Sequence, residues 1–390
     1  MDRILDRRAL LRVAVVGGGA VAFSGALWQD AFAAVAQPGP SPYGDLGPAD
    51  ANGVQLPAGF TSRVIGRSRQ RVGTTGYVWH DAPDGGACFP DGSGWIYVSN
   101  SEVPLVGGAS AVRFAADGTI TGAYRILSGT SVNCAGGATP WGTWLSCEEV
   151  PWGRVFETWP GGGRSGVARS RMGRFKHEAA ACDPVRKVVY LTEDETDGCF
   201  YRFIPDTWGN LDTGRVEVLC GAADLTDGPV TWRPIPDRDG LPIPTRLQVG
   251  AAKHFNGGEG CYYAGDVCYF TTKGDNRVWA YDAAAQRLSL AYDDSLVPGG
   301  AAPLTGVDNI TGAASGDLFV AEDGGNMEIN LITPSGVVAP FARVTGQSGS
   351  ELCGPAFNPA GDRFYFSSQR GTTGQSSGGI TYEVRGPFRR

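Results

Sequence analysis

The sequence of 390 residues contains few lysines, histidines and methionines. There are three His and three Met residues. Lys occurs only at Lys176, Lys187, Lys253 and Lys273, so Arg supplies most of the positive charge. The net charge is −7, which is the wrong sign for a protein that binds the phosphate backbone of nucleic acids. We therefore expect no nucleic-acid partner.

Several catalytic and metal-binding motifs are also absent. The sequence has no H-E-x-x-H zinc motif, no G-x-x-x-x-G-K-[ST] phosphate-binding loop and no C-x-x-C pair. These absences argue against a zinc protease of that class and against a P-loop nucleotide-binding protein. The nine Cys residues are an odd number, so an exported form has at least one thiol that is free, metal-bound or paired with another chain.

Residues 1–33 have the pattern of an export signal. Arg7-Arg8 precede an apolar run from Val13 to Leu27, and Ala31-Phe32-Ala33 follows. A charged start, an apolar middle and an A-x-A end are typical of a signal peptide, and the paired arginines resemble the twin-arginine (Tat) type. We expect the Tat export machinery as a partner, a periplasmic or extracellular protein, and no stable membrane anchor after cleavage. An ordinary secretory signal or a membrane anchor is the alternative.

One strand pattern occurs six times in the rest of the chain, which is rich in Gly (59 residues). Each copy is a run of β-forming residues around a central aromatic residue, followed by polar or acidic residues. The steps between the aromatic residues are 47, 46, 79, 50 and 46. Four of them match a four-stranded propeller blade of roughly 40–50 residues. The aromatic residues are Tyr97, Trp144, Tyr190, Tyr269, Phe319 and Tyr365.

These steps predict an all-β fold, a six-bladed β-propeller formed by residues 60–390, with a leader segment at 34–59. We interpret residues 222–250, within the long step, as an inserted loop. The last blade, from residues 351–387, is short of one strand. We expect Phe60–Ile65 to supply it, which closes the ring and removes an open edge. A β-sandwich lacks the even step, and a β-helix has shorter repeats.

Polar residues recur just after the aromatic strand and at the start of the strand before it. The innermost strands of a propeller line its channel, so equivalent residues meet at one mouth. Like charges held together raise each other's pKa unless cations neutralise them. Oxygen ligands suit Ca²⁺, whereas a thiolate and an imidazole suit iron or zinc. The pattern predicts a multinuclear metal site; the alternative for any single residue is an ordinary solvated or capping role. The residues are Asn100, Glu102, Glu148, Glu149, Glu193, Asp194, Glu195, Asp275, Glu322, Asp323, Gln369 and Arg370 after the strand, and Cys88, Cys134, His177, Glu178, Glu259, Asp308, Asn309, Glu351 and Cys353 before it.

The segment that begins at Asn133 has a distinctive order of residues. It reads Asn133-Cys134-Ala135-Gly136-Gly137, then Thr139-Pro140-Trp141-Gly142-Thr143-Trp144-Leu145, then Cys147-Glu148-Glu149. Together with Lys176-His177-Glu178-Ala179, Tyr190-Leu191-Thr192-Glu193-Asp194, Asp308-Asn309 and Phe319-Val320-Ala321-Glu322-Asp323, this order resembles the PhoX-type alkaline phosphatases and their uncharacterised relatives over roughly residues 55–388.

The resemblance implies an exported propeller that hydrolyses phosphomonoesters at a channel-mouth cluster of Fe³⁺ and Ca²⁺. It also implies the identity of the ligands. Cys134 corresponds to an iron ligand, Glu149 is the ligand that we predict from the Glu-Glu pair, and both are predicted to be catalytic. The further implied ligands are the carboxylates of Glu178, Glu259 and Glu322, with Asn100 and Glu102 as calcium ligands.

Two positions differ from the usual family pattern. Ser101 replaces a His, and Gly257 replaces an Arg that can hold phosphate. Another cation is therefore needed at the mouth. We predict Arg370 as this catalytic residue, because its planar fork matches phosphate oxygens, and Lys273 as the second candidate. The alternative for Arg370 is a solvated loop residue.

Three functions follow from these observations. The first is a metallophosphatase acting on a small phosphoester, and the second is another metal-dependent hydrolase, such as a lactonase or a phosphotriesterase. The third is a non-catalytic binding module whose metals brace the ring. We expect a monomer. We also expect Cys134 to be unpaired, because a thiolate ligand cannot be in a disulfide, while some of the other cysteines form bridges.

Overall fold

The structure, a computed structural model, describes residues 34–390. The predicted signal peptide at 1–33 lies outside the described residues. Within them the chain contains strands and short 3-10 helices but no α-helix, and none of its helices has the length and apolar character that a membrane span needs. The 3-10 helices are η1 (Ser170–Met172), η2 (Thr245–Leu247), η3 (Lys273–Asp275), η4 (Asp294–Leu296), η5 (Pro298–Gly300), η6 (Gly371–Thr373) and η7 (Ser376–Gly378).

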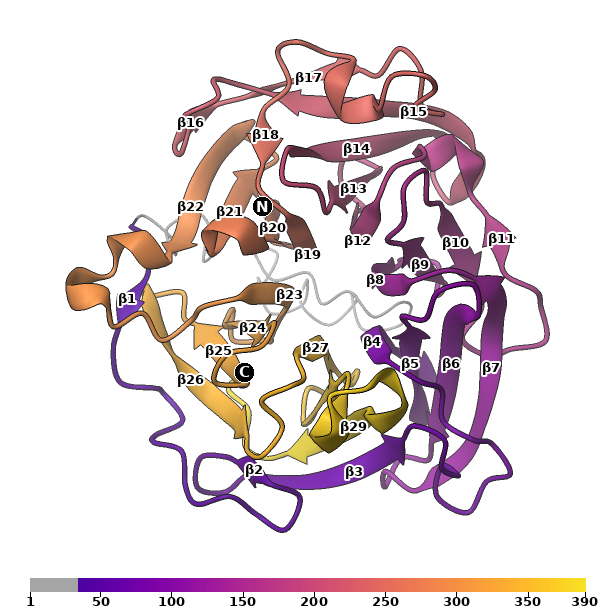
Figure 1. The fold of residues 1–390 in the computed structure, drawn as a ribbon, viewed down its shortest axis with the longest axis vertical. Coiled ribbons are helices and arrows are strands. Elements are labelled where there is room, and N and C mark those ends of the chain that lie inside the picture. The colour runs from indigo at the N-terminus through magenta and orange to yellow at the C-terminus, as the bar shows by residue number, and fades with distance from the viewer. Residues whose placement is uncertain (1–33) are drawn as a thin grey trace, which may run out of the picture.

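Six sheets, each with four antiparallel main strands, form a ring of blades around a common centre (Figure 1). The predicted all-β, six-bladed propeller is confirmed. The predicted aromatic residues lie in the second strand of each blade and are almost fully buried. The first three blades consist of β4 (Pro83–Asp91), β5 (Gly94–Ser101), β6 (Gly107–Phe114) and β7 (Ile120–Thr130); of β8 (Asn133–Ala138), β9 (Trp144–Glu148), β10 (Val155–Thr158) and β11 (Val167–Ala168); and of β12 (His177–Asp183), β13 (Val188–Glu193), β14 (Gly198–Thr207) and β15 (Asn210–Cys220).

The last three blades complete the ring. In the sixth blade the outermost strand comes from the start of the propeller, because β3 pairs antiparallel with β29. Every other blade takes its four main strands from one continuous segment of the chain. The strands are β19 (Gly258–Ala264), β20 (Val267–Thr272), β21 (Arg277–Asp282) and β22 (Arg287–Asp293); β23 (Val307–Gly312), β24 (Leu318–Glu322), β25 (Glu328–Ile332) and β26 (Val337–Val344); and β27 (Leu352–Phe357), β28 (Arg363–Ser368), β29 (Ile380–Arg385) and β3 (Thr61–Arg67).

The two segments predicted as a leader and as an inserted loop both pack against blades. In residues 34–59, β1 (Gln37–Pro38) and β2 (Val54–Gln55) pair with β26. In residues 222–250, β16 (Gly228–Pro229) pairs with β22 and β17 (Thr231–Pro234) with β15. A further short strand, β18 (His254–Phe255), pairs with β14.

Candidate metal centre at the channel mouth

The innermost strands of the six blades, β4, β8, β12, β19, β23 and β27, surround the centre of the ring (Figure 1). In five of them an acidic residue or a cysteine lies where the pairing register with the next strand shifts: Asp84, Cys134, Glu178, Glu259 and Asp308. Such bulges turn a side chain away from the regular alternation of a strand and occur next to active sites. The bulges therefore help to aim these side chains toward a shared space.

Each blade adds a second side chain from the loop after its second strand. This residue follows the buried aromatic residue by four or five positions. The mouth thus combines two positions from every blade, one near the start of the inner strand and one in this loop. In blade order the pairs are Asp84 and Glu102, Cys134 and Glu149, Glu178 and Asp194, Glu259 and Lys273, Asp308 and Asp323, and Glu351 and Arg370.

Three groups of these side chains have the spacing of metal ligands. In each group the possible ligand atoms lie within 4.8 Å of one another. Metal–ligand bonds of about 2.0–2.6 Å place two ligands of one ion within about 5 Å. Cys134 and Glu178 each belong to two groups, so the three positions are consecutive. The groups are Asp84, Glu102 and Cys134; Cys134, Glu149 and Glu178; and Glu178, Glu259 and Asp308.

Glu178 shows most directly that this cluster suits cations. Its residue is 0 % exposed, and neither carboxylate oxygen has a hydrogen-bond partner among the described residues. Burial raises the pKa of Glu178 well above its ordinary value, and the neighbouring carboxylates of Glu259 and Glu149 raise it further. An unpaired buried charge costs several kcal/mol. A cation bound by either of the two groups that contain Glu178 would remove that cost, so the residues fit a bound metal.

The other members of the cluster are also buried next to carboxylates. Burial raises the pKa of Glu149 to about 7, and it raises the pKa values of Asp84 and Asp308 well above their ordinary range, with neighbouring carboxylates adding to each shift. Burial and nearby carboxylates also raise the pKa of the Cys134 thiol. A metal ion favours the deprotonated form of all these ligands.

Three cations surround the acidic cluster, and each already contacts a carboxylate. Lys176 Nζ lies 2.9 Å from Glu149 Oε1 and 2.9 Å from Asp194 Oδ2. Lys273 Nζ lies 2.7 Å from Glu259 Oε1, and Arg370 Nη1 lies 2.8 Å from Glu351 Oε2. These three positive charges do not balance the nine carboxylates of the mouth: Asp84, Glu102, Glu149, Glu178, Asp194, Glu259, Asp308, Asp323 and Glu351.

Two predicted ligands are used for other contacts. Asn100 is fully hydrogen-bonded: Nδ2 donates to the carbonyl oxygens of Cys134 (3.1 Å) and Ala135 (2.7 Å), and Oδ1 accepts from Trp144 Nε1 (2.9 Å) and Ser146 Oγ (2.8 Å). These hydrogen bonds fix the strand that carries Cys134 and use both the amide nitrogen and the amide oxygen of Asn100, whose role as a calcium ligand stays a prediction.

Glu322 is held in a similar way. Its Oε1 accepts hydrogen bonds from Thr305 N (2.9 Å) and Asn330 Nδ2 (3.1 Å), and its Oε2 accepts from Glu328 N (3.1 Å). These donors anchor the carboxylate within its own blade, and Glu322 is in none of the groups. The ligand role implied for it has no support in this geometry. The adjacent Asp323 reaches the mouth instead, 3.5 Å from Lys273 Nζ.

Two members of the three groups, Asp84 and Asp308, are not among the ligands that the family resemblance implies. Asp308 belongs to the recurring polar pattern, whereas Asp84 does not, because that pattern places the first inner strand near Cys88, four residues after Asp84. The missed signal was position: Asp84 and Asp308 precede Tyr97 and Phe319 by 13 and 11 residues, close to the spacing of Glu178 and Glu259 in their blades.

None of the nine cysteines, all of which lie in the described residues, forms a disulfide. Cys134 is therefore unpaired, in agreement with the prediction. The bridges expected among the other cysteines are not formed in this structure.

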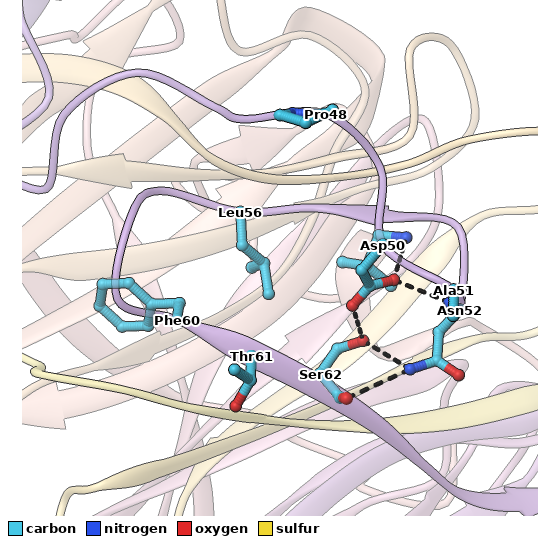
Figure 2. Close-up of a pocket in the computed structure, with 9 residues that line it drawn as sticks. Pro48, Asp50, Ala51, Asn52, Leu56, Phe60, Thr61 and Ser62 are labelled. Carbon is cyan, nitrogen blue, oxygen red and sulfur yellow. Dashed lines mark hydrogen bonds between the residues drawn. The ribbon is translucent and has the colours of Figure 1, made fainter.

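A surface pocket elsewhere contains none of these groups. It lies where the loop around residues 48–56 passes over the start of β3, and Figure 2 shows Asp50, Asn52 and Ser62 hydrogen-bonded to one another at one side of it. Its lining contains a single ionisable residue, Asp50, whose Oδ1 accepts the backbone N–H groups of Asn52 (2.8 Å) and Val54 (3.0 Å). The channel mouth is the better candidate for a functional site.

The model of the family described as alkaline phosphatase PhoX matches residues 95–166 and 151–292, which together span half of the chain. The chain belongs to the PhoX alkaline phosphatase family. The matched part contains Cys134, Glu149, Glu178 and Glu259 of the cluster. A search of curated proteins finds no match.

Solved structures agree with the PhoX assignment at the level of the fold. The structure of Pseudomonas fluorescens PhoX in complex with vanadate, a transition state analogue, is 17 % identical, with a TM-score of 0.71 over 88 % of this chain and 97 % of that chain. A Bacteroides thetaiotaomicron protein of unknown function is 8 % identical, with a TM-score of 0.52 over 84 % of this chain and 76 % of that one. At these sequence identities both matches bear on the fold alone.

Proposed function

We propose that this protein is an exported, metal-dependent phosphatase that hydrolyses small phosphomonoesters at the channel mouth. The observation that carries the proposal is the buried, unpartnered carboxylate of Glu178 between two groups with metal-ligand spacing, in a member of the PhoX family. The vanadate complex of the Pseudomonas fluorescens protein supports phosphoryl chemistry in this family.

The ligand types favour two kinds of metal ion. Cys134 belongs to the groups with Glu102 and with Glu149, and a thiolate among carboxylates suits Fe³⁺. The group of Glu178, Glu259 and Asp308 offers only oxygen atoms, which suits Ca²⁺. When bound, such ions supply the positive charge that polarises a phosphoryl group.

The cations of the chain then serve to hold the substrate. Arg370 and Lys273 each carry a charge at the mouth and are 36 % and 39 % exposed, so a phosphate can reach them. The backbone N–H of Lys273 donates to the carbonyl oxygen of Gly257 (2.8 Å), which places Lys273 beside the position of the Arg usual in the family. We propose that both cations bind phosphate oxygens, with Arg370 as the bidentate partner.

Metal analysis combined with an activity assay tests the proposal. Protein purified after native export should contain iron and calcium, should absorb visible light through an iron–thiolate bond, and should hydrolyse p-nitrophenyl phosphate. A chelator should remove the activity, and returning the metals should restore it. Metal-loaded protein that hydrolyses a lactone or a phosphotriester but no phosphomonoester would overturn the proposal. Loss of colour in Cys134→Ser, with calcium retained, would assign the thiolate to iron.

Export and assembly state remain separate proposals. We infer Tat export from the paired arginines and apolar run of residues 1–33, and we propose that the exported protein acts as a monomer. Fractionation of cells that express the chain with Arg7-Arg8 changed to Lys-Lys tests the first, because a Tat substrate should then stay in the cytoplasm. Light scattering of the purified protein tests the second.

A further inference from the structure

The inner hairpin of the fourth blade contains two cysteines. Cys261 lies in β19 and Cys268 in β20, joined by the two-residue turn Gly265–Asp266. Cys261 pairs with Phe270 and Cys268 with Tyr263, so the two cysteines are diagonal neighbours on the same face of the hairpin.

The two sulfur atoms are in direct contact inside the protein. Cys261 Sγ lies 3.2 Å from Cys268 Sγ, and the residues are 8 % and 0 % exposed. Both belong to one hydrophobic cluster with Tyr190, Phe200 and Phe270. A disulfide requires the sulfurs to approach from 3.2 Å to about 2.05 Å.

This contact sets the pair apart from the other seven cysteines. Cys199 contacts His254 Nδ1 (3.7 Å), and Cys353 contacts the carbonyl oxygens of Pro83 (3.2 Å) and Ser367 (3.7 Å). Among the described residues, Cys261 and Cys268 are the only cysteines whose sulfur atoms are within hydrogen-bond distance and geometry of each other.

We propose that Cys261 and Cys268 form a cross-strand disulfide once the chain meets a disulfide oxidant. The two thiols together lose two electrons and two protons, and one S–S bond forms. A low-molecular-weight disulfide such as oxidised glutathione accepts them, its own S–S bond breaks, and two glutathione thiols are released. The modification is independent of the proposed phosphatase function.

The same hairpin carries two residues of the proposed metal site at the channel mouth. Glu259 lies two residues before Cys261 on β19, and Lys273 directly follows β20. Gly258 and Thr272, the neighbours of these two residues, are paired in register. A bond between Cys261 and Cys268 therefore ties together the two strands that carry a predicted ligand and a predicted phosphate-binding cation.

Peptide mass mapping tests the proposal on the full-length protein. Both cysteines lie in one tryptic peptide, 254–273, because no Lys or Arg interrupts it. Protein incubated with oxidised glutathione, then unfolded and alkylated without reduction, should give this peptide without alkyl groups and two hydrogen atoms lighter than the dithiol form. Prior reduction should restore two alkylated cysteines. Alkylation of both residues without reduction, or glutathione attached to either, would overturn the proposal.

Two variants show which sulfurs are involved. In Cys261→Ser, Cys268 should become alkylated without reduction. In the matched control Cys182→Ser, which changes a cysteine on the neighbouring inner strand β12, peptide 254–273 should remain oxidised. If the oxidised form of peptide 254–273 is lost in Cys182→Ser as well, the bond is not confined to Cys261 and Cys268. The wild-type map decides the matter if a variant does not fold.

Discussion

Two glutamates with nearly the same burial, Glu383 in the sixth blade and Glu178 at the channel mouth, have opposite surroundings. Glu383 is 2 % exposed, and its oxygens accept hydrogen bonds from Arg363 Nη1 (2.6 Å), Arg63 Nη2 (2.8 Å) and the Tyr365 hydroxyl (2.6 Å). Glu178 has no such partner. The chain thus supplies its own cations to Glu383, which supports the fold, and it leaves Glu178 without a partner at the site where we propose that metal ions bind.

The largest effect that follows from this difference is the loss of activity in Glu178→Gln. The amide cannot share a negative charge between two metal positions, so we expect phosphomonoester hydrolysis to fall by more than about 10²-fold, with metal content reduced. The metal-free variant should nevertheless be at least as stable as the metal-free wild type at about pH 8, because an unpaired buried charge has been removed.

Assays of metal content, turnover and urea unfolding after chelation check both halves of this prediction. Active, fully metal-loaded Glu178→Gln would show that Glu178 is not a ligand. A strong loss of metal-free stability would show that it has a structural partner in solution.

Glu383→Gln should behave in the reverse way. It leaves Arg363, which is 8 % exposed, without its full charge partner, and breaking a buried ion pair costs about 3–5 kcal/mol. We expect that loss in urea unfolding, with kcat per folded molecule unchanged. The control is Asp227→Asn, which breaks an exposed pair with Arg287 and should cost less than about 1 kcal/mol. Reduced metal content in folded Glu383→Gln would contradict the distinction between the two glutamates.

The repeat of buried aromatic residues was sufficient to predict the fold, because a strand buried on both faces leaves a regular trace in the sequence. The repeat also predicts that equivalent positions share one mouth, and the resemblance to the PhoX family singles out ligands among them. Of these, Cys134, Glu149, Glu178 and Glu259 belong to the three groups, whereas Glu322 does not. Asp84 could have been found from the same spacing once the inner strand was placed correctly.

Position in the repeat could not show how each side chain is used. Glu322 follows its aromatic strand as the other acidic residues do, yet backbone N–H groups of its own blade hold its carboxylate. Asn100 is likewise satisfied by β8 and by Trp144 and Ser146 of β9. Hydrogen bonds of this kind depend on loop conformation and on neighbouring blades, which leave no pattern in the strand that carries the residue.

The acidic cluster also predicts how pH acts on the protein with and without metals. Burial raises the pKa values of Glu149 to about 7 and of Glu351 to about 8, from an ordinary value of 4.5. The folded state therefore retains protons that the unfolded state has already lost. The metal-free protein should be most stable below the unfolded pKa and should lose several kcal/mol of stability as the pH rises from about 5 to about 8.

The metal-loaded protein should show the opposite trend, because deprotonated carboxylates and thiolate bind cations more tightly as the pH rises. Urea unfolding of chelated and metal-loaded protein across this range checks both trends. A metal-free protein whose stability is flat or increases with pH would show that the mouth carboxylates are neutralised within the chain, as Glu383 is.

The smallest expected effect separates a phosphate-binding cation from an ordinary ion pair. Arg370 and Arg389 are alike in exposure, at 36 % and 43 %, and each contacts a buried carboxylate, Glu351 at 2.8 Å and Asp317 at 3.3 Å. Only Arg370 lies at the mouth. Arg370→Ala removes charge-assisted hydrogen bonds to the substrate, so KM for a phosphomonoester should rise about tenfold with metal content unchanged. Arg389→Ala should leave KM and kcat as they are. If Lys273→Met raises KM while Arg370→Ala does not, the cation beside Gly257 holds the phosphate and Arg370 only neutralises Glu351.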